Sequence, residues 1–486
     1  MSRISRSWRV AVLAAVCATA VLASDEDRFE VKYAKNFTLR GGRVSVDHAF
    51  GDVVIDSQEG SQAQVRATIR ASDPSFGNQI HIITEESAGG VSVRTEYPEH
   101  HSHRGSFSYS VDYRITVPPN TPVTVTNRFG GIDVHDLRAS SEFINSQGSV
   151  KLRDMKGTQR VENAFGSIEV KNNTGPLTIK NANGSISVRD VTGKLDVTNR
   201  FGSVEVSNAG DDATIRNSNG SVSARDVNGS LNIVNSFASV TASSVKGSVE
   251  ITNGNGRVEV KDVGGNASVK TSFGSVDVRD LKGNLSVTAQ NSKVEAKTIG
   301  GMATVSTTFG SVDIRDVGGP LTVTNENGSI VAENVLGSFT AETRFGSVRA
   351  DNIRGSATVQ NANGSVQLSD VARHAKIRTS FGSAFVKGIG GAIDIQNSNG
   401  AISVSGMTGG PCKPVVLRTT FSSIKVGVPS NASYTVNART TFGRINSSLP
   451  ITSTTLSDEM VVGTIGGGSC RMELANSNGS ITIEKD

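Results

Sequence analysis

Tryptophan, tyrosine and cysteine are scarce in this chain of 486 residues, which has 1 Trp, 5 Tyr and 3 Cys. No Cys-x-x-Cys pair and no zinc-type Cys/His spacing occurs, which excludes the common zinc and redox motifs. No apolar run reaches the roughly 20 residues of a membrane-spanning helix. The formal net charge is only +4, too close to neutral to predict a nucleic acid or an anionic membrane as partner.

Glycine is abundant, with 52 residues, but it does not follow the Gly-X-Y spacing of collagen. Hydrophobic residues make up 36% and charged residues 19%, so the chain is not a disordered polyelectrolyte. This composition predicts a folded, turn-rich, all-β protein.

The first 23 residues predict a secretory signal peptide. Arg3, Arg6 and Arg9 precede an apolar stretch, residues 10–23, that ends in small residues before Ser24. We therefore expect an exported protein, located in the periplasm, at the cell surface or outside the cell.

An internal repeat is the strongest pattern in the chain. Phe and Asn (once Gln) alternate every 18 residues, and the unit runs sixteen times without insertion or deletion from residue 129 to residue 399. Such regularity predicts a solenoid. The Phe residues of this position are Phe129, Phe165, Phe201, Phe237, Phe273, Phe309, Phe345 and Phe381.

Each unit alternates β-branched apolar residues with polar ones over two segments of about seven residues, which predicts two strands per unit. Glycine takes the first position of fourteen of the sixteen units and the tenth position of thirteen. We expect left-handed backbone at both positions, where a Cβ would be penalised. One unit is then one coil of a right-handed parallel β-helix, made of a strand, a corner, a second strand and a second corner.

An Asn row supports the stacking of 18-residue coils. Two places before the Phe/Asn position, Asn recurs in eight consecutive units, and stacked amides can hydrogen-bond along such a row. A 36-residue coil would also keep the row, but its wide interior would hold too few large side chains. The row consists of Asn127, Asn145, Asn163, Asn181, Asn199, Asn217, Asn235 and Asn253.

Charged positions also repeat. Basic residues at the sixth position alternate with acidic residues at the fourth, as in Asp277 and Arg279, so we expect a self-paired, solvated face rather than a polyanion groove. Asp recurs at the seventh position and exchanges with Asn, which favours a side chain capping its own turn over a calcium site.

Few residues stand outside the repeat as candidates for a singular site. His100, His101 and His103 form the one His cluster, which we interpret as a polar loop and only weakly as a metal site. Cys412 and Cys470 could form a disulfide in an oxidising compartment, or could remain unpaired thiols. No cofactor motif and no catalytic constellation interrupts the repeat.

These features predict four regions: a signal peptide (1–23), a β-rich N-terminal cap and entry region (24–121), a regular solenoid (122–410), and irregular C-terminal coils with a cap (411–486). Near the ends lie Phe50-Gly-Asp-Val, Val117-Pro-Pro, and Val462-Gly-Thr-Ile-Gly-Gly-Gly followed by Asn478-Gly-Ser-Ile. With the repeated turns, these motifs resemble the bacterial putative-adhesin family of β-strand-repeat domains of unknown function. The resemblance implies an exported parallel β-helix and supplies no catalytic residues.

The functional hypothesis from the sequence is a non-enzymatic exported β-solenoid, acting as an adhesin or cell-envelope scaffold without a cofactor. The alternative is a module that binds a polysaccharide or another envelope polymer, and a β-helical polysaccharide-active enzyme is a weaker one. The expected partner is a surface or envelope ligand, protein or glycan. The sequence leaves the identity of this ligand and the oligomeric state open.

Overall fold

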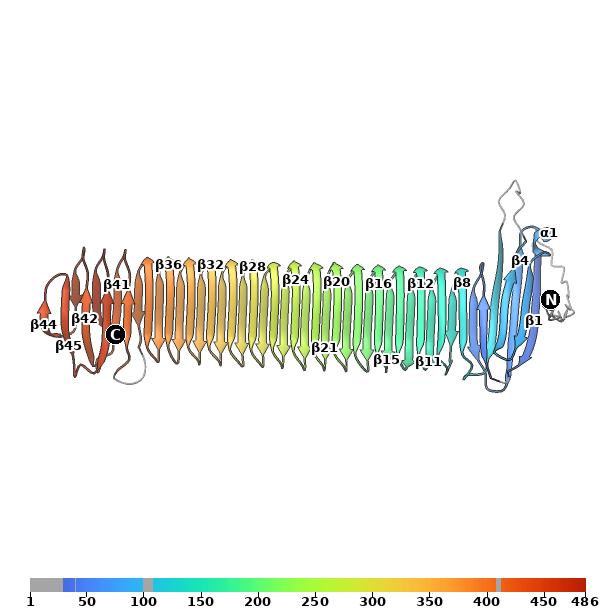
Figure 1. Ribbon diagram of the computed structural model, residues 1–486, viewed down its shortest axis with the longest axis horizontal. Helices are drawn as coiled ribbons and strands as arrows, with labels where there is room; N and C mark the ends of the chain where they lie inside the picture. The colour runs from blue at the N-terminus through green and yellow to red at the C-terminus, as the bar shows by residue number, and fades with distance from the viewer. Residues whose placement is uncertain (1–28, 40, 99–107, 408–411) are drawn as a thin grey trace, which may run out of the picture. The chain divides into compact units, whose positions relative to one another are not determined.

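The computed structural model describes residues 29–39, 41–98, 108–407 and 412–486, and the chain divides into an N-terminal unit (1–193) and a C-terminal unit (194–486). Within each unit the strands belong to two sheets, named here A and B (Figure 1). The single described helix, α1 (Pro74–Gly77), has four residues. Among the described residues, no helix has the length and apolar character needed to cross a membrane.

In the N-terminal unit, sheet A contains β1 (Phe29–Thr38), β3 (Val53–Ser57), β4 (Gln62–Ala71), β7 (Tyr109–Val117), β9 (Ile132–His135), β11 (Val150–Lys156), β13 (Ile168–Thr174) and β15 (Ile186–Val191). Sheet B contains β2 (Arg43–Asp47), β5 (His81–Ser87), β6 (Gly90–Glu96), β8 (Val123–Phe129), β10 (Ser141–Gln147), β12 (Gln159–Phe165) and β14 (Leu177–Asn183).

The strands of the C-terminal unit continue the alternation. Sheet A contains β17 (Val204–Ala209), β19 (Val222–Val227), β21 (Val240–Val245), β23 (Val258–Val263), β25 (Val276–Leu281), β27 (Val294–Ile299), β29 (Val312–Val317), β31 (Ile330–Val335), β33 (Val348–Ile353), β35 (Val366–Val371), β37 (Ala384–Ile389), β39 (Ile402–Ser405), β41 (Ile424–Val428), β43 (Ile445–Ser447) and β47 (Ile481–Lys485). Sheet B contains β16 (Leu195–Phe201), β18 (Ala213–Asn219), β20 (Leu231–Phe237), β22 (Val249–Asn255), β24 (Ala267–Phe273), β26 (Leu285–Asn291), β28 (Ala303–Phe309), β30 (Leu321–Asn327), β32 (Phe339–Phe345), β34 (Ala357–Asn363), β36 (Ala375–Phe381), β38 (Ile393–Asn399), β40 (Val415–Arg418), β42 (Tyr434–Arg439), β44 (Thr452–Leu456), β45 (Met460–Ile465) and β46 (Cys470–Ala475).

In the regular coils, strands pair in parallel with the equivalent strand 18 residues further on. Val161 lies opposite Ile179 in the N-terminal unit, and Val323 lies opposite Ala341 in the C-terminal unit. This register confirms the predicted all-β fold of stacked 18-residue coils, a parallel β-solenoid, and excludes the 36-residue coil.

A buried apolar ladder fills the space between the two sheets. In the coil of residues 310–327, Val312, Ile314 and Val317 of β29 and Leu321 and Val323 of β30 are each at most 1% exposed. Since these side chains recur in register in every regular coil, each coil covers the apolar atoms of its neighbours.

The Asp row at the seventh position has a backbone cause rather than the predicted turn-capping role. Asp316 has φ of 59°, in the left-handed region, and the equivalent Asn334 has φ of 58°. This conformation interrupts the alternation of the strand, so that Arg315 and Asp316 both point outward and Val317 again points inward. Asp, Asn and Gly tolerate left-handed backbone better than other residues. The Asn334 side chain donates to Asp316 of the preceding coil at 2.8 Å.

The two recurrent glycines are required for different reasons. Gly364, at the first position, has φ of 135°, and a Cβ there would lie 2.2 Å from the carbonyl oxygen of Gly346 in the preceding coil. The expectation of left-handed backbone is wrong for most tenth positions, such as Gly247, which lacks a positive φ. A Cβ on Gly247 would instead lie 2.6 Å from the carbonyl oxygen of Gly229, so close coil stacking selects glycine there.

Both ends of the chain depart from the regular coil. In the N-terminal unit, β4 pairs antiparallel with β1 and β7, and β5 and β6 form an antiparallel hairpin. In the C-terminal unit, β46 lies between β40 and β42, and β45 pairs antiparallel with β42 and β44. Antiparallel additions of this kind protect the edge of a parallel stack from further pairing.

Candidate functional surface

The Asn row is stacked as predicted, but its hydrogen bonds are not those of an amide ladder. Asn361 is 2% exposed, and its Nδ2 donates to the carbonyl oxygens of Gly346 in the preceding coil and Gly364 in its own coil, both at 3.0 Å. Its Oδ1 has no hydrogen-bond partner among the described residues. Within the row of consecutive Asn residues, Asn181 likewise donates from its Nδ2 to the carbonyl oxygens of Gly166 and Gly184, both at 3.2 Å, and its Oδ1 has no hydrogen-bond partner among the described residues. The prediction of amide-to-amide bonds is therefore wrong, because the amide nitrogens donate to corner carbonyls. The Asn side chains at this position thus stabilise the corners by hydrogen-bonding their backbone carbonyls.

The Phe and Asn residues of the last repeat position form an exposed row that we name the Phe/Asn edge. The register places Phe309 opposite Asn291 and Asn327, and Phe345 opposite Asn327 and Asn363. Large and small side chains thus alternate from coil to coil, as the sequence predicted. In the C-terminal unit the Phe residues of the edge are between 42% and 71% exposed: Phe201, Phe237, Phe273, Phe309, Phe345, Phe381, Phe421 and Phe442.

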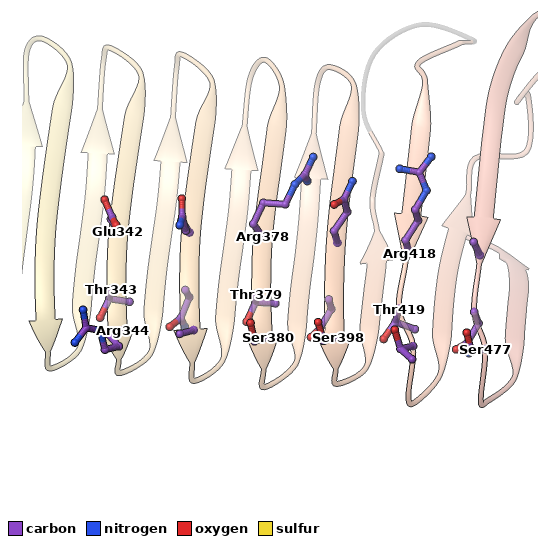
Figure 2. Close-up of a pocket in the computed structure, with 18 of the residues that line it drawn as sticks. Glu342, Thr343, Arg344, Arg378, Thr379, Ser380, Ser398, Arg418, Thr419 and Ser477 are labelled. Carbon is purple, nitrogen blue, oxygen red and sulfur yellow. The ribbon is translucent and has the colours of Figure 1, made fainter.

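A groove of about 1,090 Å³ lies beside this edge on the outer face of sheet B. It crosses eight strands of the C-terminal unit, β30, β32, β34, β36, β38, β40, β42 and β46, and its lining is polar. Figure 2 shows Arg378 on β36 and Arg418 on β40, with β38 between them, and the hydroxyls of Thr379 and Ser380 near the corner.

Ion pairs fix some of the groove's cations and leave one unpaired. Arg378 binds Asp394 through two nitrogens, at 3.1 and 2.6 Å. Arg418 donates to Glu473 at 2.8 Å, and this hydrogen bond lowers the pKa of the Glu473 carboxyl. The guanidinium of Arg344 makes no hydrogen bond or ion pair with a described residue. Arg344 is thus the cation most available to a ligand.

The outer face of sheet A carries interleaved charges of both signs. Asp277 accepts from Arg279 of its own strand at 2.8 and 2.9 Å and from Arg257 at 3.1 Å. Arg315 pairs with Asp313 at 2.9 Å. In these coils the basic residues of the sixth position are thus paired with acidic neighbours on the same face.

A buried polar cluster lies in the N-terminal unit. His48 is 2% exposed, its Nδ1 lies 3.1 Å from the Thr95 hydroxyl, and its ring packs edge-on against Tyr113 at 4.9 Å between centroids. Burial lowers the pKa of His48 from 6.5 to about 4. The Thr95 hydroxyl lies 2.7 Å from that of Tyr113. Since the cluster is buried, it holds strands together and offers no surface to a ligand.

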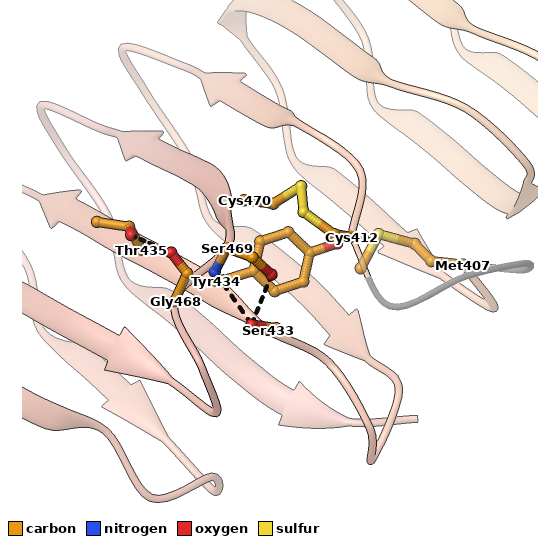
Figure 3. The surroundings of a disulfide bond; sticks show 8 residues. All are labelled: Met407, Cys412, Ser433, Tyr434, Thr435, Gly468, Ser469 and Cys470. Carbon is orange, nitrogen blue, oxygen red and sulfur yellow. Dashed lines mark hydrogen bonds between the residues drawn. A yellow bond between two sulfur atoms is a disulfide. The ribbon is translucent and has the colours of Figure 1, made fainter.

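The two remaining sequence candidates have different outcomes. Cys412 and Cys470 form a disulfide with a Cα–Cα distance of 5.3 Å, beside the buried Tyr434 (Figure 3). It joins the segment before β40 to the start of its neighbour β46. His100, His101 and His103 lie outside the described residues, as does the signal-peptide segment. Within the described ranges, no group of three or more His, Cys, Asp or Glu residues is placed to hold a metal ion.

Sequence reasoning missed the groove and the exposure of the Phe rings. The groove combines residues from Thr324 to Ser477, which are 153 positions apart, and the strand order at the C-terminal end was not readable from the repeat. The Phe periodicity was visible, but periodicity alone does not tell whether a large residue points inward or outward.

The described features define a repeat-built parallel β-solenoid whose outer surface recurs from coil to coil. Residues 275–484 match the family model described as Toastrack DUF4097, a domain of unknown function, which confirms the resemblance over this region. The crystal structure of a putative cell adhesion protein from Clostridium sporogenes aligns over 94% of this chain and 100% of that chain. Its sequence identity of 7% and TM-score of 0.16 support no inference. No curated protein matches.

Proposed function

We propose that this protein is a non-enzymatic, exported β-solenoid that serves as an adhesin or as a scaffold of the cell envelope. The observation that carries the proposal is the groove on sheet B, which extends over eight strands and is lined by equivalent positions of successive strands. A catalytic site needs a singular set of groups held in fixed geometry. An extended, repeated surface suits the binding of an extended ligand.

A second candidate is a module that binds an envelope polysaccharide, and the chemistry of the groove favours it. Arg344, Gln360 and Gln396 provide planar polar groups, and Thr and Ser hydroxyls line the corner side. Such groups can hydrogen-bond the hydroxyls and carboxylates of a sugar polymer.

The test is a binding screen of the purified chain against cell-wall polymers, glycans and matrix proteins, with the Arg344→Glu variant. Arg349→Glu is the matched control, because Arg349 is an exposed arginine on the outer face of sheet A. Binding that Arg344→Glu weakens and Arg349→Glu leaves unchanged supports the groove. Binding that neither variant alters excludes the groove as the site, and turnover of any bound polymer would refute the non-enzymatic proposal.

A further inference from the structure

The Phe/Asn edge keeps its alternation where the chain order changes. At the C-terminal end β46 follows β42 in sequence but lies between β40 and β42 in the sheet. Asn478, just after β46, consequently pairs with both Phe421 and Phe442. Along the chain the order is Phe421, Phe442, Asn478, whereas across the sheet Asn478 lies between Phe421 and Phe442. Duplication of a 36-residue segment would not produce this order, so at the C-terminal end the alternation is kept by the arrangement of the strands and not by the order of the chain.

The phenyl rings of the edge contribute little to the core. Because these Phe residues are between 42% and 71% exposed, the single chain gains only part of the free energy that full burial of their side chains would provide. Soluble monomers seldom expose extended apolar rows, and such rows mark interaction sites.

The spacing of the rings leaves slots between them. In the N-terminal unit, Phe50 and Phe129 lie opposite each other in a parallel β-bridge, and their rings stack with centroids 5.0 Å apart and an interplanar angle of 5°. On the edge, successive Phe residues are two strand spacings apart, about 9.5 Å. A flat ring placed above the intervening Asn would thus lie about 5 Å from both neighbours, close to the separation of the Phe50–Phe129 pair.

The slots form a regular series, and their repeat restricts what can occupy all of them. A partner with a different repeat would fall out of register after a few slots. A second copy of this chain has the same repeat by construction. The Asn residues that mark the slots in the C-terminal unit are Asn219, Asn255, Asn291, Asn327, Asn363, Asn399 and Asn478.

The available area is sufficient for a stable dimer. A Phe side chain has about 150–250 Å² of surface, so the half-exposed rings of two C-terminal units together offer on the order of 1,600 Å². This equals the size of a standard specific interface.

We propose that the Phe/Asn edge of the C-terminal unit binds the same edge of a second copy, with the rings of one copy inserted into the slots of the other. The contact is isologous, with the two copies antiparallel, so that the assembly closes as a dimer. This inference goes beyond the proposed function and does not depend on the ligand of the groove.

The experiment is sedimentation equilibrium of the purified chain, with circular dichroism to verify the fold of each variant. The wild-type chain is expected to dimerise reversibly. The triple variant Phe273→Ser, Phe309→Ser, Phe345→Ser should raise the dimer dissociation constant about a hundredfold or more, because central apolar anchors dominate interfaces. A matched control removes three exposed apolar residues elsewhere on the unit, Met302, Leu336 and Phe385, by mutation to Ser, and should change the constant less than about threefold.

A second variant distinguishes insertion of Phe rings into the slots from non-specific hydrophobic association. Asn291→Phe, Asn327→Phe and Asn363→Phe together fill three slots from within, as Phe129 does beside Phe50, while adding apolar surface. Insertion predicts weaker dimerisation, whereas non-specific association predicts stronger dimerisation. A wild-type chain that stays monomeric, or a slot-filled variant that associates as tightly as the wild type, overturns the proposal. A monomer that binds a glycan along the edge overturns it as well, and leaves the proposed function intact.

Discussion

Replacing Asn361 by Asp is expected to destabilise the solenoid by about 3–5 kcal/mol. The Nδ2 group of Asn361 bridges the carbonyls of Gly346 and Gly364 at 3.0 Å, and the side chain is 2% exposed. A carboxylate removes both donors and faces the two carbonyl oxygens with a buried negative charge. Each lost hydrogen bond costs about 1–1.5 kcal/mol, and the uncompensated charge adds several more before protonation or local opening limits the cost.

The matched control comes from the chain itself. Thr343 and Thr379 occupy the equivalent position in the two adjacent coils. The hydroxyl of the equivalent Thr307 lies 3.2 Å from the carbonyl oxygen of Gln290 and 3.3 Å from that of Phe309, so it can donate to either of them. Asn361→Thr should therefore cost less than about 1.5 kcal/mol.

Urea unfolding and hydrogen exchange measured by mass spectrometry test this prediction. The free energy of unfolding of a solenoid is approximately the sum of the stabilities of the single coils and of the contacts between adjacent coils. A destabilised coil should therefore open locally, and exchange protection should fall first in residues 339–381 and last in residues 195–255. Equal costs for the two variants, or a uniform loss of protection along the C-terminal unit, would refute the role assigned to the Asn row.

Three further predictions follow from single contacts. Burial lowers the pKa of His48 to about 4, so as the pH falls the unfolded chain binds this proton before the folded chain does. The free energy of unfolding of the N-terminal unit should therefore decrease by up to about 3 kcal/mol between pH 6.5 and pH 4. In urea titrations, the His48→Gln variant should show a smaller decrease over the same pH range. Replacing Cys412 and Cys470 by Ser opens a link between residues 58 positions apart and should cost about 4 kcal/mol, measured as a lower urea midpoint. Gly364→Ala should cost at least about 2 kcal/mol, because its Cβ meets the backbone of Gly346, whereas the neighbouring Ser365→Ala should leave the melting temperature unchanged.

Much of the fold could be predicted because the length of the repeat determines which residues lie opposite each other in adjacent strands. Phe165 and Asn183 are 18 residues apart and lie opposite each other in adjacent strands, as the unbroken period required. Apolar alternation fixed which residues face the interior, since only one face of each strand is buried. The candidate surface was less predictable, because Arg418 and Arg439 come from β40 and β42, whose lateral order is set by the irregular C-terminal coils, in which β46 lies between them.

The hydrogen-bond partners within the repeat also needed the structure. Sequence periodicity places Asn217 above Asn235, but whether an amide bonds its neighbour or a corner carbonyl depends on distances of a few tenths of an ångström. The same holds for Gly247, where the approach of the preceding coil, and not the local φ, excludes a side chain.

The sequence by itself determined the 18-residue coil, the buried ladder and the alternation of Phe with Asn, because periodicity and burial are local and repeat along the chain. Only the tertiary structure decided that the rings point outward, that β46 inserts between β40 and β42, and that Cys412 meets Cys470. These features depend on the geometry of the corners and on which strands β46 pairs with. Both are determined by contacts between residues that are distant in the sequence.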